Sequence, residues 1–406
     1  MPAMLDRIDH QFRLNNLSDE ILNQAPNQAL ARVIKIFRTQ LLATQISSDN
    51  TTVEYPVGIS KTILINTLLG CAIGDSYGAG LENYAREWIA DNIDFTHFVD
   101  LRTNHDVQAF RDPKYRVWDY TDDTQMTIGL IKALIKRESS TASIEDLIMQ
   151  CWLKEYEQDC QSKGDRGHGY ILSYFKGNKA IDEIRERQRI KLYPGNAAPM
   201  RATPIGFLPE EEINKIATIN ANLTHPHPKS IAASILIARA TRFLVVERGD
   251  PRKLIEYCLK YIENTDQETI EMLRQTDELP TPLNLTKNQL QFLTKYRDPS
   301  PPTIFIDGQT VPIKFSRGEN GLFADAMLTA VSALYILKHS PNTFLGLISA
   351  VQLGGDVDSI ASIVTAILGG RYGLGSLPEY MRQNVEGQDY LQKIATDFHE
   401  YLKSLN

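Results

Sequence analysis

Apolar residues recur at helical spacing along most of the chain, and this pattern predicts a mostly α-helical protein. The run KTILINTLLGCAIGD, residues 61–75, opens a long series of such segments. The apolar positions of the two clearest later segments are Ile231, Ile235 and Ala238 in the first and Ile360, Ile363, Val364 and Ile367 in the second. Strand signals are scarce by comparison.

One stretch departs from the helical pattern, TIFIDGQTVPIKF at residues 303–315. Asp307 and Gly308 lie between two runs rich in β-branched and aromatic residues, and an Asp-Gly pair in this setting favours a tight β-hairpin. The stretch falls in a polar, proline-containing segment of about residues 264–317. We therefore predict a hairpin-bearing insertion into a helical domain.

The first 55 residues are predicted to form a separate helical arm that ends in the polar linker QISSDNTTVEYPVG. One apolar stripe runs along its best helix, and such a stripe must be covered either by the rest of the chain or by a partner. Its residues are Leu30, Val33, Ile34, Phe37 and Leu41. We predict a single all-α domain over residues 56–406, preceded by this arm.

Composition narrows the possible partners of the chain. Its 406 residues carry a net charge of -7 without a dense basic run, which argues against general nucleic-acid binding. No stretch approaches the ~20 apolar residues that cross a bilayer, and the N-terminus lacks the apolar core of a secretory signal. The four cysteines form no CxxC pair, so reduced thiols are expected. We expect a cytoplasmic protein without membrane contact; delivery into another cell by a signal-less secretion route remains compatible.

Two short acidic segments, DYTDDTQ and GGDVDSIAS, carry the strongest chemical signal. Each offers two carboxylates and a hydroxyl at the start of a predicted helix, where a solvated capping turn is the alternative interpretation. Such oxygen ligands suit Mg2+, Mn2+ or Ca2+. If the fold brings the segments together, divalent cations would resolve the repulsion between their charges. The donors are Thr121, Asp122 and Asp123 in the first segment and Asp356, Asp358 and Ser359 in the second.

Five ordered blocks of sequence resemble the ADP-ribosylglycohydrolase family, the group typified by the enzyme that reactivates dinitrogenase reductase. The blocks span roughly residues 60–380. They are GCAIGDSYGAGLE, YTDDTQM, PGNAAPMRATPIGF, THPHP and GGDVDSIAS. One such block alone would be weak support, but five in the family's order make the resemblance specific.

The resemblance implies an all-α globule in which the two acidic segments hold a pair of Mg2+ ions, with Mn2+ as an alternative, in one cleft. Ser359 replaces the usual threonine but keeps the hydroxyl oxygen. Ala197 replaces a glycine that is common in the family, and we expect its Cβ to alter the backbone's approach to a ligand.

Catalytic residues follow from the same resemblance. Glu82 matches an acidic position in part of the family. Because both acidic segments are assigned to cations, a carboxylate outside them is available as general acid or base. Asp122 and Asp356 are the other catalytic candidates. The small residues of this block, Gly74 and Gly78 among them, are expected to allow a tight backbone path near the ligand.

The expected substrate contacts lie in several blocks. GCAIGDSYGAG and GDRGHGYI are interpreted as glycine-bearing loops that approach a diphosphate. Arg201 is either a diphosphate contact or a structural ion-pair partner, and His225 and His227 are expected to mark a helix entry rather than to bind zinc. The predicted substrate-binding residues are Asp75, Gly167, His168, Gly169, Tyr170, Gly195, Asn196, Met200, Arg201, His225, Gly354 and Tyr372.

The function predicted from these residues is Mg2+-dependent hydrolysis that removes ADP-ribose from modified protein side chains. Arginine is the first expected acceptor and serine the second, so the bond is N- or O-glycosidic. The expected partner is the ADP-ribose moiety of a modified protein. Two alternatives stay open: a catalytically inactive ADP-ribose-binding or structural member of the family, and a dinuclear-metal phosphohydrolase.

Overall fold

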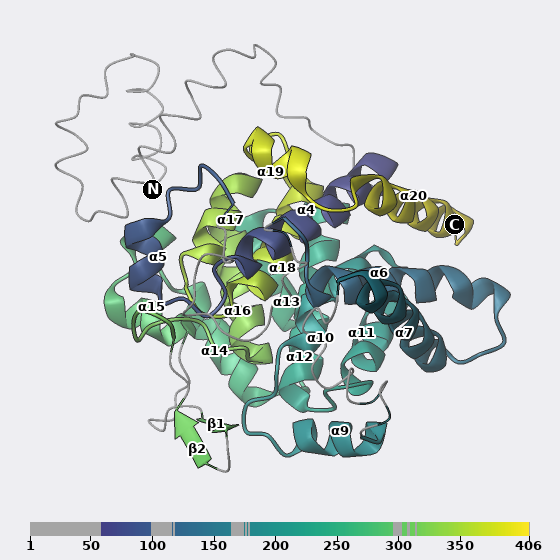
Figure 1. Cartoon of the computed structure of the whole chain (residues 1–406), viewed down its shortest axis with the longest axis horizontal. Helices are drawn as coiled ribbons and strands as arrows, with labels where there is room; N and C mark the ends of the chain where they lie inside the picture. Colours follow the sequence, from purple (N-terminus) through teal and green to yellow (C-terminus); the bar gives the residue numbers. More distant parts are fainter. Residues whose placement is uncertain are drawn as a thin grey trace.

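The computed structural model describes residues 58–98, 116, 118–163, 174, 177, 179–294, 303–306, 309–312 and 315–405, and helices dominate these segments (Figure 1). The predicted all-α fold is confirmed. The N-terminal arm with its apolar stripe, and residues 167–170 of the predicted substrate site, lie outside the described residues.

The α-helices account for most of the described residues. They are α4 (Lys61–Ala79), α5 (Arg86–Asn92), α6 (Asp122–Lys136), α7 (Ile144–Lys163), α9 (Ile181–Arg189), α10 (Ala197–Met200), α11 (Glu210–Asn222), α12 (Pro228–Thr241), α13 (Leu254–Leu259), α14 (Gln267–Asp277), α15 (Lys287–Thr294), α16 (Ala326–His339), α17 (Thr343–Val351), α18 (Val357–Tyr372), α19 (Glu379–Asn384) and α20 (Gln388–Ser404). Among the described residues, none of these helices is long and apolar enough to cross a membrane.

The predicted hairpin is confirmed. Strands β1 (Thr303–Ile306) and β2 (Gln309–Pro312) pair antiparallel, with Ile306 opposite Gln309. They project at the lower edge of the helical body in Figure 1. The segment predicted as an insertion is not all loop and strand, however, because α14 and α15 also lie within it and both pack against α16.

Helices α4 and α18 pack side by side at the centre of the molecule (Figure 1). Glycines at every fourth position of α4 make this approach possible. A Cβ built on Gly74 would lie 2.2 Å from the Ala361 carbonyl oxygen, and one on Gly78 would lie 2.5 Å from Asp358 Cα. The interpretation of this block as a ligand-facing glycine loop is therefore wrong. The segment is helical through Ala79, and Gly74 and Gly78 face another helix.

Replacement of Gly74 by alanine should destabilise the protein even though alanine is the better helix former. The new methyl group would meet backbone atoms of α18, which cannot move aside as a side-chain tip can. Overpacking of this kind costs about 1–3 kcal/mol. Chemical denaturation of Gly74→Ala should show this loss. Gly375→Ala is the control, because a Cβ there has no atom within 4 Å, and equal stability of both variants would contradict the close packing.

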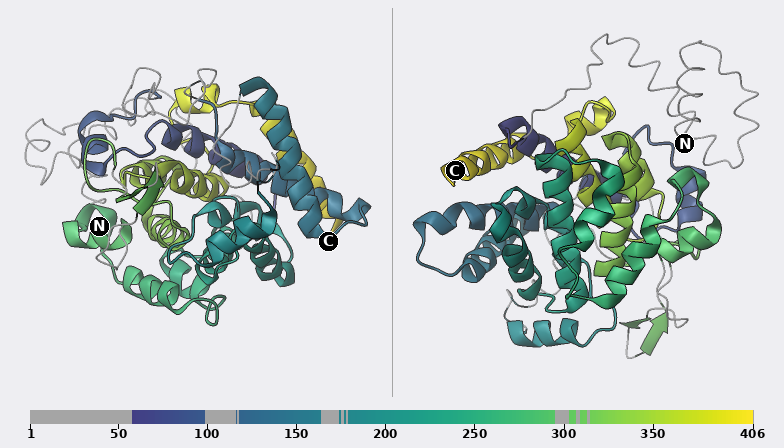
Figure 2. Two further views of the ribbon diagram at one scale, coloured as in Figure 1. Left: turned by 60° about the horizontal axis from the view of Figure 1, so that its bottom comes forward. Right: turned by 180° about the vertical axis from the view of Figure 1, so that it is seen from behind.

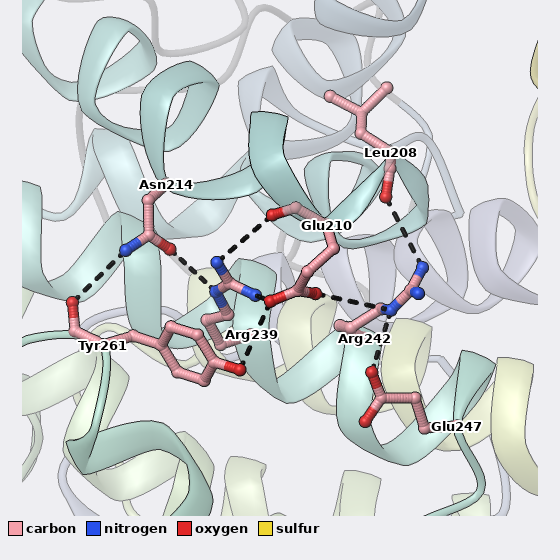
Figure 3. A network of polar contacts seen from close by, with 7 residues as sticks. All are labelled: Leu208, Glu210, Asn214, Arg239, Arg242, Glu247 and Tyr261. Carbon is pink, nitrogen blue, oxygen red and sulfur yellow. Dashed lines mark hydrogen bonds and ion pairs between the residues drawn. The ribbon is translucent and has the colours of Figure 1, made fainter. Parts of the chain in front are cut away.

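A polar network ties α11 to α12 (Figure 3). The Arg239 guanidinium forms an ion pair with Glu210 and donates a hydrogen bond to Asn214 Oδ1 at 2.7 Å. It also lies over the Tyr261 ring, 3.6 Å from the ring centroid. Arg242 pairs with Glu247 at 3.0 Å. Arg239 is almost fully buried, so these contacts offset the cost of removing its charge from water.

The C-terminal helix α20 packs against α4 and α6, and its yellow ribbon lies near the blue-green α7 in the left view of Figure 2. Cys71, Cys151 and Cys258 are buried free thiols, as predicted. Burial raises the pKa of Cys71 to about 11. These thiols are therefore protonated at neutral pH, in keeping with a role in the core.

Candidate functional site

The first acidic segment is held in place by a carboxylate from another helix. Asp75, fully buried on α4, accepts hydrogen bonds from the hydroxyl groups of Thr121 and Thr124, both at 2.7 Å, and from their backbone N–H groups at 3.0 Å. Burial raises the pKa of Asp75, and these hydrogen bonds oppose the rise. Asp75 thus caps the start of α6 and fixes the direction of Asp122 and Asp123.

The second acidic segment follows two glycines with left-handed backbones. Gly354 and Gly355 have φ angles of 68° and 78°. A Cβ would lie 2.4 Å from Arg86 N at the first and 2.1 Å from Leu322 O at the second, so only glycine fits. The predicted contact residue Gly354 therefore has a structural reason to be glycine. This turn leads directly into Asp356 and the start of α18.

Backbone hydrogen bonds join this turn to the segment that carries Glu82. Asn83 N–H donates to the Gly355 carbonyl, and Gly355 N–H donates to the Tyr84 carbonyl, both at 2.7 Å. Asp356 N–H donates to the Leu322 carbonyl at 2.9 Å. Residues far apart in sequence are thereby fixed beside one another.

The two acidic segments lie close together, as the family resemblance implied. Burial raises the pKa of Asp123 well above its usual value, and the next largest cause is the charge of Asp358 on α18, followed by the charges of Asp75 and Asp122. Burial likewise raises the pKa of Asp356, followed by the charge of Asp358. Like charges from both segments therefore share one poorly solvated space.

Carboxylate oxygens of Glu82, Asp356 and Asp358 lie within 4.8 Å of one another. We refer to these three residues together with Asp123 as the acidic cluster. Glu82 lies outside the two acidic segments in the sequence, but the turn after α4 brings it against Asp356 and Asp358 in space. Glu82 is partly exposed, whereas Asp358 is buried, so Glu82 lies on the solvent side of the cluster.

The acidic cluster fits a hard divalent cation. Asp123 is buried, and its Oδ1 has no hydrogen-bond partner among the described residues. Buried oxygen atoms nearly always have a hydrogen-bond partner or a bound ion, so this oxygen is available to a cation. The available donors are carboxylate and hydroxyl oxygens, which are ligands preferred by Mg2+ and Mn2+. Thr121 and Ser359, the predicted hydroxyl ligands, are also buried at the two helix starts.

Asn196 binds a carboxylate of the acidic cluster. Its Nδ2 donates to Asp356 Oδ2 at 2.6 Å and to Thr329 Oγ1 at 3.0 Å. Asn196 was predicted to contact substrate, but in the structure its amide orients a carboxylate of the cluster. Beside it, Gly195 lies against His225, since a Cβ at residue 195 would be 3.2 Å from His225 Nε2.

The two histidines of the THPHP block lie just before the start of α12, as predicted. His227 caps α12, and its ring accepts from Lys229 N–H at 3.1 Å. His225 is buried, with Nδ1 2.8 Å from Thr224 Oγ1. Burial and then the charge of Arg201 hold the pKa of His225 well below its usual value. Neither histidine belongs to a metal-binding group among the described residues.

Arg201, Met200 and Tyr372 are three further residues predicted to contact substrate. Arg201 is fully buried and donates to Asn220 Oδ1 at 2.7 Å and to Thr224 Oγ1 at 2.8 Å, while its guanidinium lies over Trp152. It is therefore a structural residue, held by neutral oxygens rather than by the expected ion pair. Met200 is also buried. Tyr372 ends α18, about 21 Å from Asp358 by the helical rise.

Comparison with known proteins agrees with this geometry. The sequence model of the ADP-ribosylglycohydrolase family matches residues 62–405. The chain belongs to this family. The chain is 25% identical over 352 residues to ADP-ribosylhydrolase ARH3 of Mus musculus, which covers 82% of this chain and 90% of the mouse protein. It is 24% identical over 356 residues to ADP-ribosylhydrolase ARH3 of Homo sapiens, which covers 82% and 91%.

A solved structure described as an ADP-ribosylglycohydrolase-related protein complex has a similar fold. It superposes with a TM-score of 0.51 at 19% sequence identity, and the match covers 84% of this chain and 98% of that one. Membership of the ADP-ribosylglycohydrolase family supports a glycohydrolase that acts on ADP-ribose.

Two residues that support the site were missed in the sequence. Thr124 binds Asp75, and Thr329 holds the Asn196 amide. Thr124 had a visible signal, since it closes the Thr-Asp-Asp-Thr block. Thr329 had no such signal, because it lies within the apolar helix α16, where a threonine commonly packs in the core.

Proposed function

We propose that this protein is a divalent-metal-dependent hydrolase that removes single ADP-ribose units from modified protein side chains. The observation that carries the proposal is the acidic cluster, in which carboxylates from three separate parts of the chain converge at one place. In a member of the ADP-ribosylglycohydrolase family, such a cluster is best explained by the chemistry of the ribose. A purely structural descendant would have no need to retain mutually repelling buried carboxylates.

The residues proposed to hold two Mg2+ ions, or Mn2+, come from both helix starts and from the Glu82 turn. When bound, the cations supply positive charge that offsets the carboxylates and polarises ribose hydroxyls or water. The proposed ligands are Thr121, Asp122, Asp123, Asp356, Asp358 and Ser359, with Glu82 added by its position in the structure.

The chain's own groups have separate proposed tasks. Asn196 occupies one oxygen of Asp356 and so fixes the orientation of that carboxylate. Glu82 accepts from Asn83 Nδ2 at 3.2 Å through Oε1 and faces the solvent side of the cluster. We propose that Glu82 moves a proton to the leaving group or from the attacking water, the role that a carboxylate has in glycoside hydrolysis.

Acceptor selectivity is proposed to reside in the end of the insertion. The chain leaving it pairs with the Glu82 turn, because Ala85 N–H donates to Ser316 O at 2.8 Å and Ser316 N–H to Asn83 O at 2.7 Å. Any acceptor that approaches Glu82 would meet this loop, and loops beside a rigid site commonly set specificity.

The test is an acceptor panel with Mg2+ present. We expect release of ADP-ribose from ADP-ribosylated arginine first and serine second, with ADP-ribosylated glutamate, ADP-ribosylated nucleic acid and free O-acetyl-ADP-ribose as the other members. Free ADP-ribose and phosphate are measured in the same reactions, and Asp356→Ala is the inactive control. Phosphate without ADP-ribose would favour the dinuclear phosphohydrolase. Binding of ADP-ribose without any release would favour the inactive binding protein.

We also propose a cytoplasmic location. The free, buried state of the described cysteines supports a reducing compartment. Cell fractionation with a tagged full-length chain tests this.

A further inference from the structure

A second cavity lies away from the acidic cluster, between α6, α7 and α20. Its volume is about 370 Å³, within the range of small-ligand sites. Lys132, on its wall, follows Asp123 on the same helix by nine residues, which the helical rise converts to about 14 Å. The cavity is therefore a separate place on the molecule and not an extension of the acidic cluster.

Basic residues dominate the wall of this cavity, although the chain as a whole is acidic. The charged residues that line it are Lys132, Lys136, Lys154, Lys393, Glu155 and Asp397. Four lysines thus face two carboxylates. The helix dipole can account for Lys136, which lies in the last turn of α6, but not for Lys154 and Lys393, which lie within α7 and α20.

Both carboxylates already have partners. Glu155 is buried, pairs with Lys132 through one oxygen and accepts from the Tyr390 hydroxyl at 2.9 Å through the other. Asp397 pairs with Lys393 at 2.5 Å. The positive charge that remains belongs to Lys136 and Lys154.

Lys136 and Lys154 have no carboxylate partner among the residues that the structure describes. Lys136 Nζ instead lies 3.7 Å from the Cys151 sulfur. Burial raises the pKa of the Cys151 thiol despite this lysine, so the thiol does not supply a compensating charge. Two ammonium groups therefore line one cavity without a carboxylate partner in the described part of the chain.

We propose that this cavity binds a small phosphate monoester, whose dianionic phosphate pairs with Lys136 and Lys154. The charge of the phosphate matches the two unpaired ammonium groups, and lysine is a common phosphate ligand. Ile135, Ile394 and the Tyr390 ring also line the cavity and provide an apolar wall for the ester group.

The test uses phenyl phosphate as the probe and the full-length chain without divalent metal. Phosphorus NMR titration should show saturable binding at millimolar concentration. The Lys136→Ala, Lys154→Ala double variant should weaken it by about tenfold or more, because both charged hydrogen bonds are removed. Both lysines are exposed, so the variant should fold normally, which circular dichroism can check.

The matched control is Lys215→Ala, Lys260→Ala, which removes an exposed lysine from α11 and another from the turn after α13 and lowers the net charge equally. This control should bind phenyl phosphate as the unchanged protein does. Absence of saturable binding to the unchanged protein would overturn the proposal. Equal weakening in the two double variants would overturn it as well, because the effect would then come from net charge.

Discussion

Replacement of Asp356 by alanine is expected to abolish metal binding and almost all hydrolysis while leaving the fold intact. Asp356 shares the acidic cluster with Glu82 and Asp358 and is oriented by Asn196. Loss of an outer partner of a metal ligand typically costs 10- to 100-fold, so loss of a ligand should reduce activity by more than about 100-fold. Calorimetric titration with Mg2+ and release of ADP-ribose are the two measurements.

Stability without metal distinguishes this expectation from simple unfolding. Removing one of several repelling carboxylates should leave the metal-free protein as stable as before or more stable. Asp389→Ala is the control, because Asp389 is an exposed acid in the first turn of α20. Unchanged Mg2+ affinity in Asp356→Ala would remove Asp356 from the metal site, and a lower unfolding temperature without metal would attribute the loss of activity to the fold.

The helices could be predicted because their signals are local. Apolar spacing located α12 and α18, and the acidic segments marked the starts of α6 and α18. The Asp-Gly pair located the hairpin between β1 and β2. Each of these features depends on a few adjacent residues, so the pattern and the structure agree.

The position of Glu82 could not be predicted, because it depends on packing between distant segments. The glycines of the block around Gly74 and Gly78 favour a loop whose backbone N–H groups approach a diphosphate. In the structure the same glycines let α18 approach α4 closely. That approach is what places Glu82, at the end of the block, beside Asp356 and Asp358. The same glycine pattern fits a ligand-binding loop or a close helix–helix contact, and only the tertiary packing shows that it is the contact.

Arg201 and Asn196 show a related limit. Residue type identifies what a side chain can bind, but not which of several suitable partners it meets. Arg201 suits a diphosphate, yet it is buried against Asn220 and Thr224. Asn196 suits a ribose hydroxyl, yet its amide holds Asp356. Asn220 and Thr224 are common residue types, and Asp356 is far from Asn196 in the sequence. The sequence alone therefore offered no reason to pair them with Arg201 and Asn196.

Glu82→Gln is expected to slow turnover by ~10²–10⁴-fold at saturating Mg2+, the range for loss of a general acid or base. Glutamine keeps the shape of the side chain but cannot exchange the proton. Because the Glu82 carboxylate lies within 4.8 Å of oxygens of Asp356 and Asp358, the variant should also bind Mg2+ more weakly. Calorimetry must therefore establish the saturating concentration before turnover is measured.

The separation of these two effects decides the role of Glu82. Turnover that stays low at saturating Mg2+ supports proton transfer, since the metal site is then filled. Recovery of full turnover at high Mg2+ would make Glu82 a metal ligand alone and shift proton transfer to Asp122 or Asp356. Glu87→Gln is the matched control, because Glu87 is an exposed glutamate on α5, just after the same turn, and pairs with Asn320. It should leave both Mg2+ affinity and turnover unchanged, since Glu87 contributes no oxygen to the acidic cluster.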